Sequence, residues 1–302
     1  MKELRFVKAI TAVENASALD PLVGRVQGVV RSVIRPQALR DLLHGVPFGH
    51  PLHPVEVQIP VGAFTSAAIL DLLPVRGTDT AAQALIGVGV LSVLPAAVSG
   101  WTDWSELHEQ QMRVGLVHAA ANIIATGLYT ASFVQRSRGK QGSGKLLALA
   151  GLATVSGAGF LGGHLSYRQA AGANHAEDVP HVFPTGWQAL AALDDLPDNE
   201  LARRVVADQP LLVYRRGDRV DVLSNVCSHL SGPLDEGELS LGDGGAVTDV
   251  GGGEACVTCP WHSSVFSLDT GEVVHGPATS PQPRFDVRVT DGQVEVLLPN
   301  AG

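Results

Sequence analysis

The sequence is poor in charged residues and in cysteine. Only 17% of its 302 residues are Asp, Glu, Lys or Arg, and the mean hydropathy is +0.17. A chain this apolar is neither disordered nor typical of ordinary soluble enzymes. Three cysteines are too few for a disulfide scaffold. A net charge of −9 leads us to expect no nucleic-acid partner.

The charge is distributed unevenly along the chain. Residues 1–180 hold 14 basic and 12 acidic side chains, whereas residues 181–302 hold 7 and 18. All three cysteines also lie in the second part. We therefore predict several domains: an interfacial or amphipathic segment over 1–39, a helical domain over 40–168, a linker over 169–183 and a second domain over 184–302.

Four stretches of the first part approach the length of about 20 apolar residues that crosses a bilayer. They cover residues 55–73, 81–100, 114–134 and 146–165. The connections between them are short, which favours an up-down bundle of four transmembrane helices. Gly159 and Gly163 have the GxxxG spacing of a helix contact. The lipid bilayer is thus an expected partner.

Several polar residues fall at the helix ends on one side of this predicted bundle. An even number of spans places the N-terminus and the second domain on that same side. The residues are His53, Glu56, Asp103, His118 and His164. Ionisable groups at membrane depth are costly unless paired or functional. They predict either a site for haem b or a quinone, or histidines that cap helices and bind lipid headgroups.

The first part also resembles a known family. The run Gly49-His50-Pro51-Leu52-His53-Pro54, the ending Gly100-Trp101-Thr102-Asp103 and the four-span layout are similar to a bacterial family of four-helix membrane proteins. The resemblance covers residues 40–168. It implies a fold and a multi-pass location in a bacterial cell membrane, but no chemistry.

The second part reads as short strands joined by turns. Residues 211–214 and 219–224 flank a turn at Gly217, and residues 286–290 and 293–298 flank Asp291-Gly292. Asp-Gly between alternating apolar residues is a strong hairpin signal. Val287 and Val289 are expected to pair with Val294 and Val296. We predict a small antiparallel β domain.

Two pairs of metal-ligating residues lie inside this β domain. One is Cys227-Ser228-His229 and the other is Cys259-Pro260-Trp261-His262. Two loops that each offer one thiolate and one imidazole suit a [2Fe–2S] centre with mixed ligation. The alternative is a zinc site that uses Cys256 and Cys259 with one histidine. Val257 and Thr258 between those cysteines resemble strand residues, which favours a buried structural role for Cys256.

These motifs, with Gly232-Pro233, Phe266, Asp269-Thr270-Gly271 and Gly276-Pro277, resemble the Rieske [2Fe–2S] family over residues 181–299. The resemblance implies that Cys227 and Cys259 ligate one iron, and that His229 and His262 ligate the other. The 29 residues between His229 and Cys259 are more than is usual, and the Gly-rich excess within 239–254 reads as an inserted loop.

The resemblance also bears on the reduction potential. High-potential members carry a disulfide between the ligand loops, with a serine and a tyrosine that bond to sulfur. Here Ser264 matches the serine, Phe266 replaces the tyrosine, and no second cysteine pair is present. We therefore expect a low or intermediate potential and a cytoplasmic location for this domain.

Three functions remain open from the sequence. The first is a membrane-anchored electron carrier that works with a redox partner protein, a quinone or both. The second is a ferredoxin component of an oxygenase system, because a complete oxygenase needs a further catalytic domain. The third is a non-enzymatic membrane redox sensor. An electron-transfer protein or oxidoreductase component is favoured over a stand-alone enzyme, and no catalytic residue is assigned.

Overall fold

The computed structural model describes residues 5–73, 75, 77–241 and 255–299. Most of the Gly-rich insertion, residues 242–254, lies outside this described part. The chain divides into two compact units. The helical unit comprises Met1–Pro36 and Pro51–Ala171, and the β unit comprises Gln37–His50 and Gly172–Gly302. The segment Gln37–His50 therefore groups with the β unit, although the sequence analysis placed residues 40–50 with the helices.

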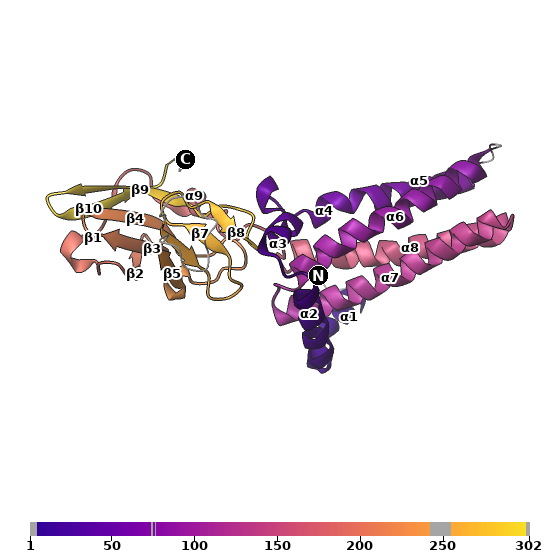
Figure 1. Ribbon diagram of the computed structural model, residues 1–302, viewed down its shortest axis with the longest axis horizontal. Helices are drawn as coiled ribbons and strands as arrows, with labels where there is room; N and C mark the ends of the chain where they lie inside the picture. Colours follow the sequence, from indigo (N-terminus) through magenta and orange to yellow (C-terminus); the bar gives the residue numbers. More distant parts are fainter. Residues whose placement is uncertain (1–4, 74, 76, 242–254, 300–302) are drawn as a thin grey trace. The chain divides into compact units, whose positions relative to one another are not determined.

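The core of the helical unit consists of two helical hairpins (Figure 1). The first contains the short helix α4 (His53–Glu56) with α5 (Gln58–Leu72), followed by α6 (Thr78–Trp104). The second contains α7 (Glu109–Ser137) and α8 (Gln141–Tyr167). The four helices His53–Leu72, Thr78–Trp104, Glu109–Ser137 and Gln141–Tyr167 are long and apolar enough to cross a membrane. The four predicted spans are confirmed as helices of the required length and composition.

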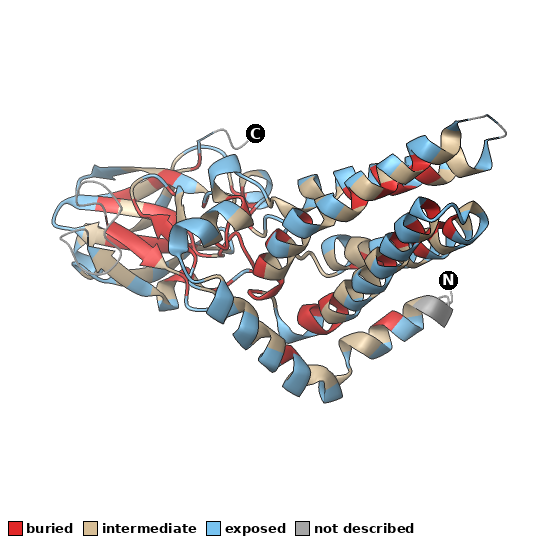
Figure 2. Cartoon of the chain, turned by 45° about the vertical axis from the view of Figure 1, so that its right-hand side comes forward, coloured by how far each residue is buried: buried red, intermediate tan, exposed pale blue. Residues whose placement is uncertain are grey.

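Most residues of these four helices are not buried within the unit, as Figure 2 shows. The buried cluster between these helices contains the small residues Ala67, Ala82 and Ala148 together with Phe64, Ile86 and Tyr129. Phe64 and Tyr129 stack with ring centroids 3.7 Å apart. Tyr129 packs against Gly151, where an added Cβ would lie 2.9 Å from its ring. Gly159 has open space around it, so the predicted GxxxG pair is not where these helices approach closely.

The helical unit begins with α1 (Arg5–Glu14), η1 (Ser17–Leu19) and α2 (Asp20–Val33), which come before the bundle. The helix α2 matches the amphipathic pattern, and its buried Val23 packs with Trp104 and Met112. Gln27 donates a hydrogen bond of 2.7 Å to the Ser105 carbonyl. This helix is therefore attached to the bundle where α6 ends and α7 begins.

The β unit contains two antiparallel sheets. The six-stranded sheet has the order β1-β10-β9-β4-β3-β2, and the four-stranded sheet has the order β5-β6-β7-β8. The strands are β1 (Gln188–Ala192), β2 (Leu201–Val206), β3 (Gln209–Arg216), β4 (Arg219–Ser224), β5 (Glu238–Leu241), β6 (Ala255–Thr258), β7 (Val265–Ser267), β8 (Val273–His275), β9 (Arg284–Thr290) and β10 (Gln293–Leu297).

Both predicted hairpins are confirmed. Strands β9 and β10 pair with Val289 opposite Val294 and Val287 opposite Val296, as expected. Their turn has positive φ at Asp291 and Gly292, which is the type I′ geometry favoured by Asp-Gly. The turn between β3 and β4 has positive φ at Gly217. The local turn chemistry therefore determines these registers.

Strand β3 buries side chains on both of its faces. Leu211 and Val213 pack into one hydrophobic cluster, whereas Leu212 and Tyr214 pack into a second one. The second cluster also contains Cys227 and Cys259. The alternation of side chains along a strand accounts for this division, and it places the metal-ligating motifs beside a packed apolar core.

Two segments outside the strands complete the β unit. Ala176, Val179 and Phe183 are buried in its first cluster, around the short helix α9 (Val179–Val182). The second half of the predicted linker over 169–183 therefore packs against this core rather than forming a free connection. The helix α3 (Gln37–His44) is the second segment, and its His44 is fully buried. The 3-10 helices η2 (Val46–Phe48), η3 (Leu193–Asp195) and η4 (Leu234–Glu236) form connections.

Candidate metal centre

Two loops of the β unit carry the cysteine and histidine motifs. Loop 1 (residues 227–232) follows β4 and leads toward η4, and loop 2 (residues 259–264) joins β6 to β7. The strands before these loops contribute Leu223 and Val257 to one hydrophobic cluster. The sheet packing therefore brings loops that are about thirty residues apart in sequence to the same cluster.

The two loops have the same backbone hydrogen bonds. In loop 1, the Cys227 N–H donates to the Gly232 carbonyl at 2.9 Å and the Ser231 N–H donates to the Cys227 carbonyl at 2.9 Å. In loop 2, the Cys259 N–H donates to the Ser264 carbonyl at 2.8 Å and the Ser263 N–H donates to the Cys259 carbonyl at 3.1 Å. Ser231 and Ser263 both have positive φ, at 64° and 61°. Each cysteine thus begins an equivalent tight loop.

The four candidate side chains converge in two pairs. Cys227 and Cys259 are both buried, and their sulfur atoms share a hydrogen bond. Donation from the Cys227 thiol lowers the pKa of Cys259 to about 7, and the same bond, with burial, raises the pKa of Cys227. The rings of His229 and His262 lie with centroids 5.1 Å apart, at an interplanar angle of 85°. The two loops thus bring one pair of thiols and one pair of imidazoles together.

Two cysteines and two histidines suit the mixed ligation of a two-iron cluster. Among the described residues, no group of three His, Cys, Asp or Glu side chains is placed to hold one metal ion. Cys256 lies in β6 between Ala255 and Val257, which belong to the cysteine-containing cluster, while Cys256 does not. Strand alternation directs its side chain to the other face. This placement disfavours the alternative of a zinc site built on Cys256 and Cys259.

Small and polar neighbours hold the two loops in place. A Cβ at Gly232 would lie 2.7 Å from Cys259 Sγ, so the loops approach closely there. The Ser264 hydroxyl accepts a hydrogen bond of 2.9 Å from the Ala278 N–H, which leaves its own proton available to a nearby acceptor. The His175 N–H donates to the Ser228 carbonyl at 2.9 Å. Phe266 is fully buried and has no donor to offer.

Residues distant in sequence also support the segment around Gly276. Asp41 of α3 accepts from the Gly276 N–H at 2.9 Å, and its other oxygen lies 2.9 Å from His275 Nδ1. Sequence reasoning missed Asp41, because no local signal connects it with a turn more than 230 residues later. His275 therefore has a structural partner within the β unit.

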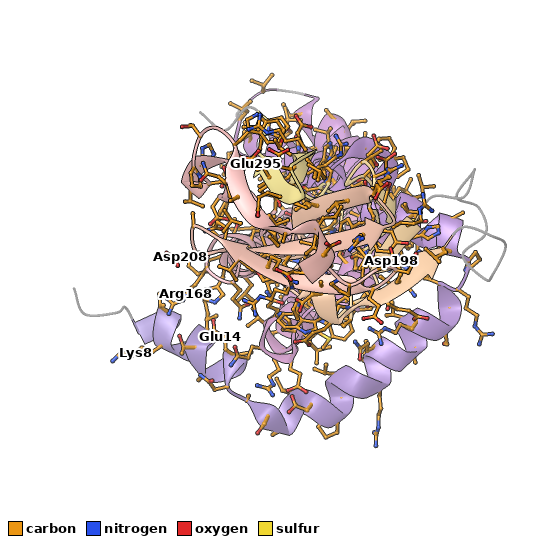
Figure 3. All side chains as sticks on the ribbon, turned by 90° about the vertical axis from the view of Figure 1, so that its left-hand side faces the viewer. Lys8, Glu14, Arg168, Asp198, Asp208 and Glu295 are labelled. Atoms are coloured by element: carbon orange, nitrogen blue, oxygen red, sulfur yellow. The ribbon has the colours of Figure 1, made fainter. Side chains whose placement is uncertain are left out.

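The polar residues expected at one face of the bundle are only partly brought together. The rings of His53 and His118 are neighbours, with centroids 6.5 Å apart. Glu56 instead accepts a hydrogen bond from Ser99. His164 Nε2 lies 2.5 Å from a carboxylate oxygen of Glu14 in α1. Glu14 is labelled in Figure 3. Asp103 lies in the last turn of α6.

An antiparallel β unit with two matched Cys/His loops defines an iron–sulfur protein with mixed ligation. The comparison with known proteins agrees: residues 186–286 match the Rieske [2Fe-2S] domain, and the chain belongs to the Rieske family through its β unit. The Rieske domain implies a [2Fe–2S] cluster. Residues 49–175 match a second family, described as "Predicted membrane protein (DUF2231)". Both expected resemblances are thus confirmed.

Similar proteins are found for the Rieske part. The anthranilate 1,2-dioxygenase ferredoxin subunit of Burkholderia cepacia is 34% identical over 36% of this chain and 90% of that relative. Ferredoxin CarAc of Metapseudomonas resinovorans is 33% identical over 36% of this chain and 92% of that relative. The solved ferredoxin of carbazole 1,9a-dioxygenase from Nocardioides aromaticivorans IC177 is 27% identical over 38% of this chain and 98% of that structure, with a TM-score of 0.31.

Proposed function

We propose that this protein is a membrane-anchored Rieske protein that carries single electrons between a redox donor and an acceptor. The observation that carries the proposal is the pair of loops with equal backbone hydrogen bonds, each presenting one cysteine and one histidine. Cys227 and Cys259 would ligate one iron, and His229 and His262 the other. The bound cluster would supply a one-electron redox centre.

The exposure of the loops supports exchange of electrons at the histidine side. Both cysteines are at most 2% exposed, whereas His262 is half-buried and its neighbour Trp261 is 49% exposed. An exposed aromatic side chain beside a ligand offers a contact surface for a partner protein. The buried thiols would keep water from an iron bound to them, and the half-buried imidazole of His262 would provide the shorter route to a partner.

The relatives favour one class of partner. The two curated relatives named above are ferredoxins, and one is named as a subunit of a dioxygenase. A role as the ferredoxin component of an oxygenase system is therefore the second candidate function. Either role needs a redox partner protein, and the cluster chemistry is the same in both.

The membrane part of the proposal rests on the helical unit. Four helices of membrane-spanning length, in a region that matches a membrane protein family, support a multi-pass anchor. An even number of spans would put the N-terminus and the β unit on one side. The free cysteines of the β unit are compatible with the cytoplasm. For a haem site in the bundle, the neighbouring rings of His53 and His118 offer the supporting arrangement.

The test is iron and sulfide analysis with EPR spectroscopy of the full chain, purified in detergent and reduced with dithionite. We expect about two irons and two sulfides per chain and the rhombic signal of a Rieske cluster. His262→Ala and Cys227→Ser should lose this signal, whereas the matched control Cys256→Ala should keep it. One zinc per chain without an EPR signal would overturn the proposal, as would loss of the signal in Cys256→Ala alone.

A further inference from the structure

The helical unit contains an internal repeat. Residues 53–72 align with residues 118–137 at an offset of 65, and residues 82–100 align with 144–162 at an offset of 62. The identical pairs of the first alignment are His53/His118, Ile59/Ile124, Gly62/Gly127 and Thr65/Thr130. Those of the second are Leu85/Leu147, Gly89/Gly151, Val93/Val155, Ala96/Ala158 and Gly100/Gly162. Each repeat is one of the two helical hairpins of Figure 1.

Equivalent residues of the two repeats touch one another in the structure. His53 faces His118 at 6.5 Å between ring centroids, and Phe64 stacks on Tyr129 at 3.7 Å. Asp71 forms a two-bond ion pair with its equivalent, Arg136. Contacts between equivalent positions are the property of an isologous interface. The two hairpins are therefore related by a pseudo-two-fold axis that passes between these three pairs.

The two histidines are held in the same way. His53 Nδ1 lies 2.7 Å from the Ala96 carbonyl, and His118 Nδ1 lies 2.8 Å from the equivalent Ala158 carbonyl. One turn beyond each carbonyl is a glycine that makes room for the ring. A Cβ at Gly100 would lie 2.7 Å from His53, and a Cβ at Gly162 would lie 3.2 Å from His118.

This hydrogen bonding fixes the chemistry of the other ring nitrogen, Nε2, of each histidine. A carbonyl only accepts, so each Nδ1 carries a proton and each neutral ring presents a lone pair on Nε2. The Asn122 amide nitrogen lies 3.2 Å from His118 Nε2, which agrees with an acceptor there. A lone pair binds a Lewis acid or a hydrogen-bond donor. It does not bind a quinone carbonyl, which is itself an acceptor.

The number of protein donors points to the kind of metal centre. A bare transition-metal ion is usually held by three or four protein ligands, yet no third His, Cys, Asp or Glu joins this pair among the described residues. A haem iron needs only axial protein ligands, because the porphyrin supplies the others. With bonds of about 2.0–2.1 Å to the metal, two imidazoles on opposite sides have centroids about 6 Å apart. The separation of 6.5 Å is close to this value.

We propose that His53 and His118 are the two axial ligands of one haem b, bound between the hairpins of the helical unit. The haem would be non-covalent, because all three cysteines lie after residue 181 and none belongs to a C-x-x-C-H motif. The Asn122 amide would turn away from Nε2 when iron binds. The inference goes beyond the electron-carrier function and does not depend on the Rieske cluster.

The test uses the full chain, produced in cells supplied with a haem precursor and purified in detergent. We expect about one haem per chain by the pyridine haemochrome assay, with a low-spin optical and EPR spectrum. His53→Ala and His118→Ala should each abolish the low-spin signal. They should also weaken haemin binding by at least about tenfold, because even outer-shell changes cost that much in metal sites. His164→Ala is the matched control, since that histidine is engaged with Glu14, and it should retain haem.

Three results would overturn the haem site. The first is a wild-type protein that holds no haem and takes up none from added haemin. The second is unchanged haem content in both ligand variants. The third is an equimolar bare metal ion that is lost in those variants. The Rieske EPR signal, recorded on the same samples, reports on the β unit alone and separates this outcome from a failure of the cluster assignment, while an unchanged helical circular-dichroism signal shows that the helical unit of each variant is folded.

Discussion

Gly232 leaves no space for a side chain between the two loops of the candidate metal centre. A Cβ there would lie 2.7 Å from Cys259 Sγ and 3.2 Å from the Trp261 ring. Because both neighbours belong to loop 2, even a methyl group would push that loop away from loop 1. Overpacking of this kind costs about 1–3 kcal/mol. Here the displacement of loop 2 would disturb the positions of the residues that would hold the cluster.

We therefore predict that Gly232→Ala lowers cluster occupancy and the free energy of unfolding of the β unit by about 1–3 kcal/mol. Iron content, EPR intensity per chain and thermal loss of the visible absorption of the cluster measure both effects. Gly28→Ala is the control, because a Cβ at that position meets nothing within 4 Å. Equal cluster content in the two variants would contradict the prediction.

The helix α3 has a structural role that becomes clear only at the scale of elements. It belongs to the β unit, where Asp41 holds both the Gly276 N–H and the His275 ring. A hydrogen bond to a charged group contributes about 1.5–3 kcal/mol. The contact fixes the turn after β8, which also contains Ala278, the partner of the Ser264 hydroxyl.

Removal of this contact should destabilise the β unit. For Asp41→Ala we predict a loss of about 2–3 kcal/mol in its free energy of unfolding. Asp41→Asn should lose less, because its oxygen still accepts from the Gly276 N–H. Thermal loss of the cluster absorption in the full chain measures both, with Glu272→Ala, an exposed acidic residue, as the control. If Asp41→Ala and Glu272→Ala were equally stable, the contact would not contribute to the stability of the β unit.

At the scale of elements, some features could be predicted from the sequence and others could not. The turn at Asp291-Gly292, the strand pattern around it and the apolar spans follow from local chemistry, and all were predicted. Cys227 and Cys259 were predicted as ligands from the spacing of their motifs and from the family resemblance, and the structure brings the two residues together. Asp41 was missed because its partners are more than 230 residues away. The internal repeat was also missed, since only nine of the 39 aligned pairs are identical, and most of these are Gly, Ala, Leu, Ile or Val, which are common in any apolar helix.

At the scale of the whole molecule, the two parts of the chain differ in net charge. Residues 181–302 contain 7 basic and 18 acidic side chains, a balance of −11, whereas residues 1–180 have a balance of +2. Asp198, Asp208 and Glu295, labelled in Figure 3, belong to this excess. A field of one sign attracts redox partners of the opposite sign and repels those of the same sign.

We predict that the reduced cluster reacts faster with a cationic than with an anionic one-electron oxidant of matched potential. At low salt the difference should be about tenfold or more. It should shrink as salt rises toward 0.1 M, where the screening length is about 10 Å. Stopped-flow absorbance of the full chain in a neutral detergent measures the rates, and an uncharged oxidant is the control. If both charged oxidants show the same salt dependence, the acidic excess does not act at the cluster, and a basic partner surface has no electrostatic advantage there.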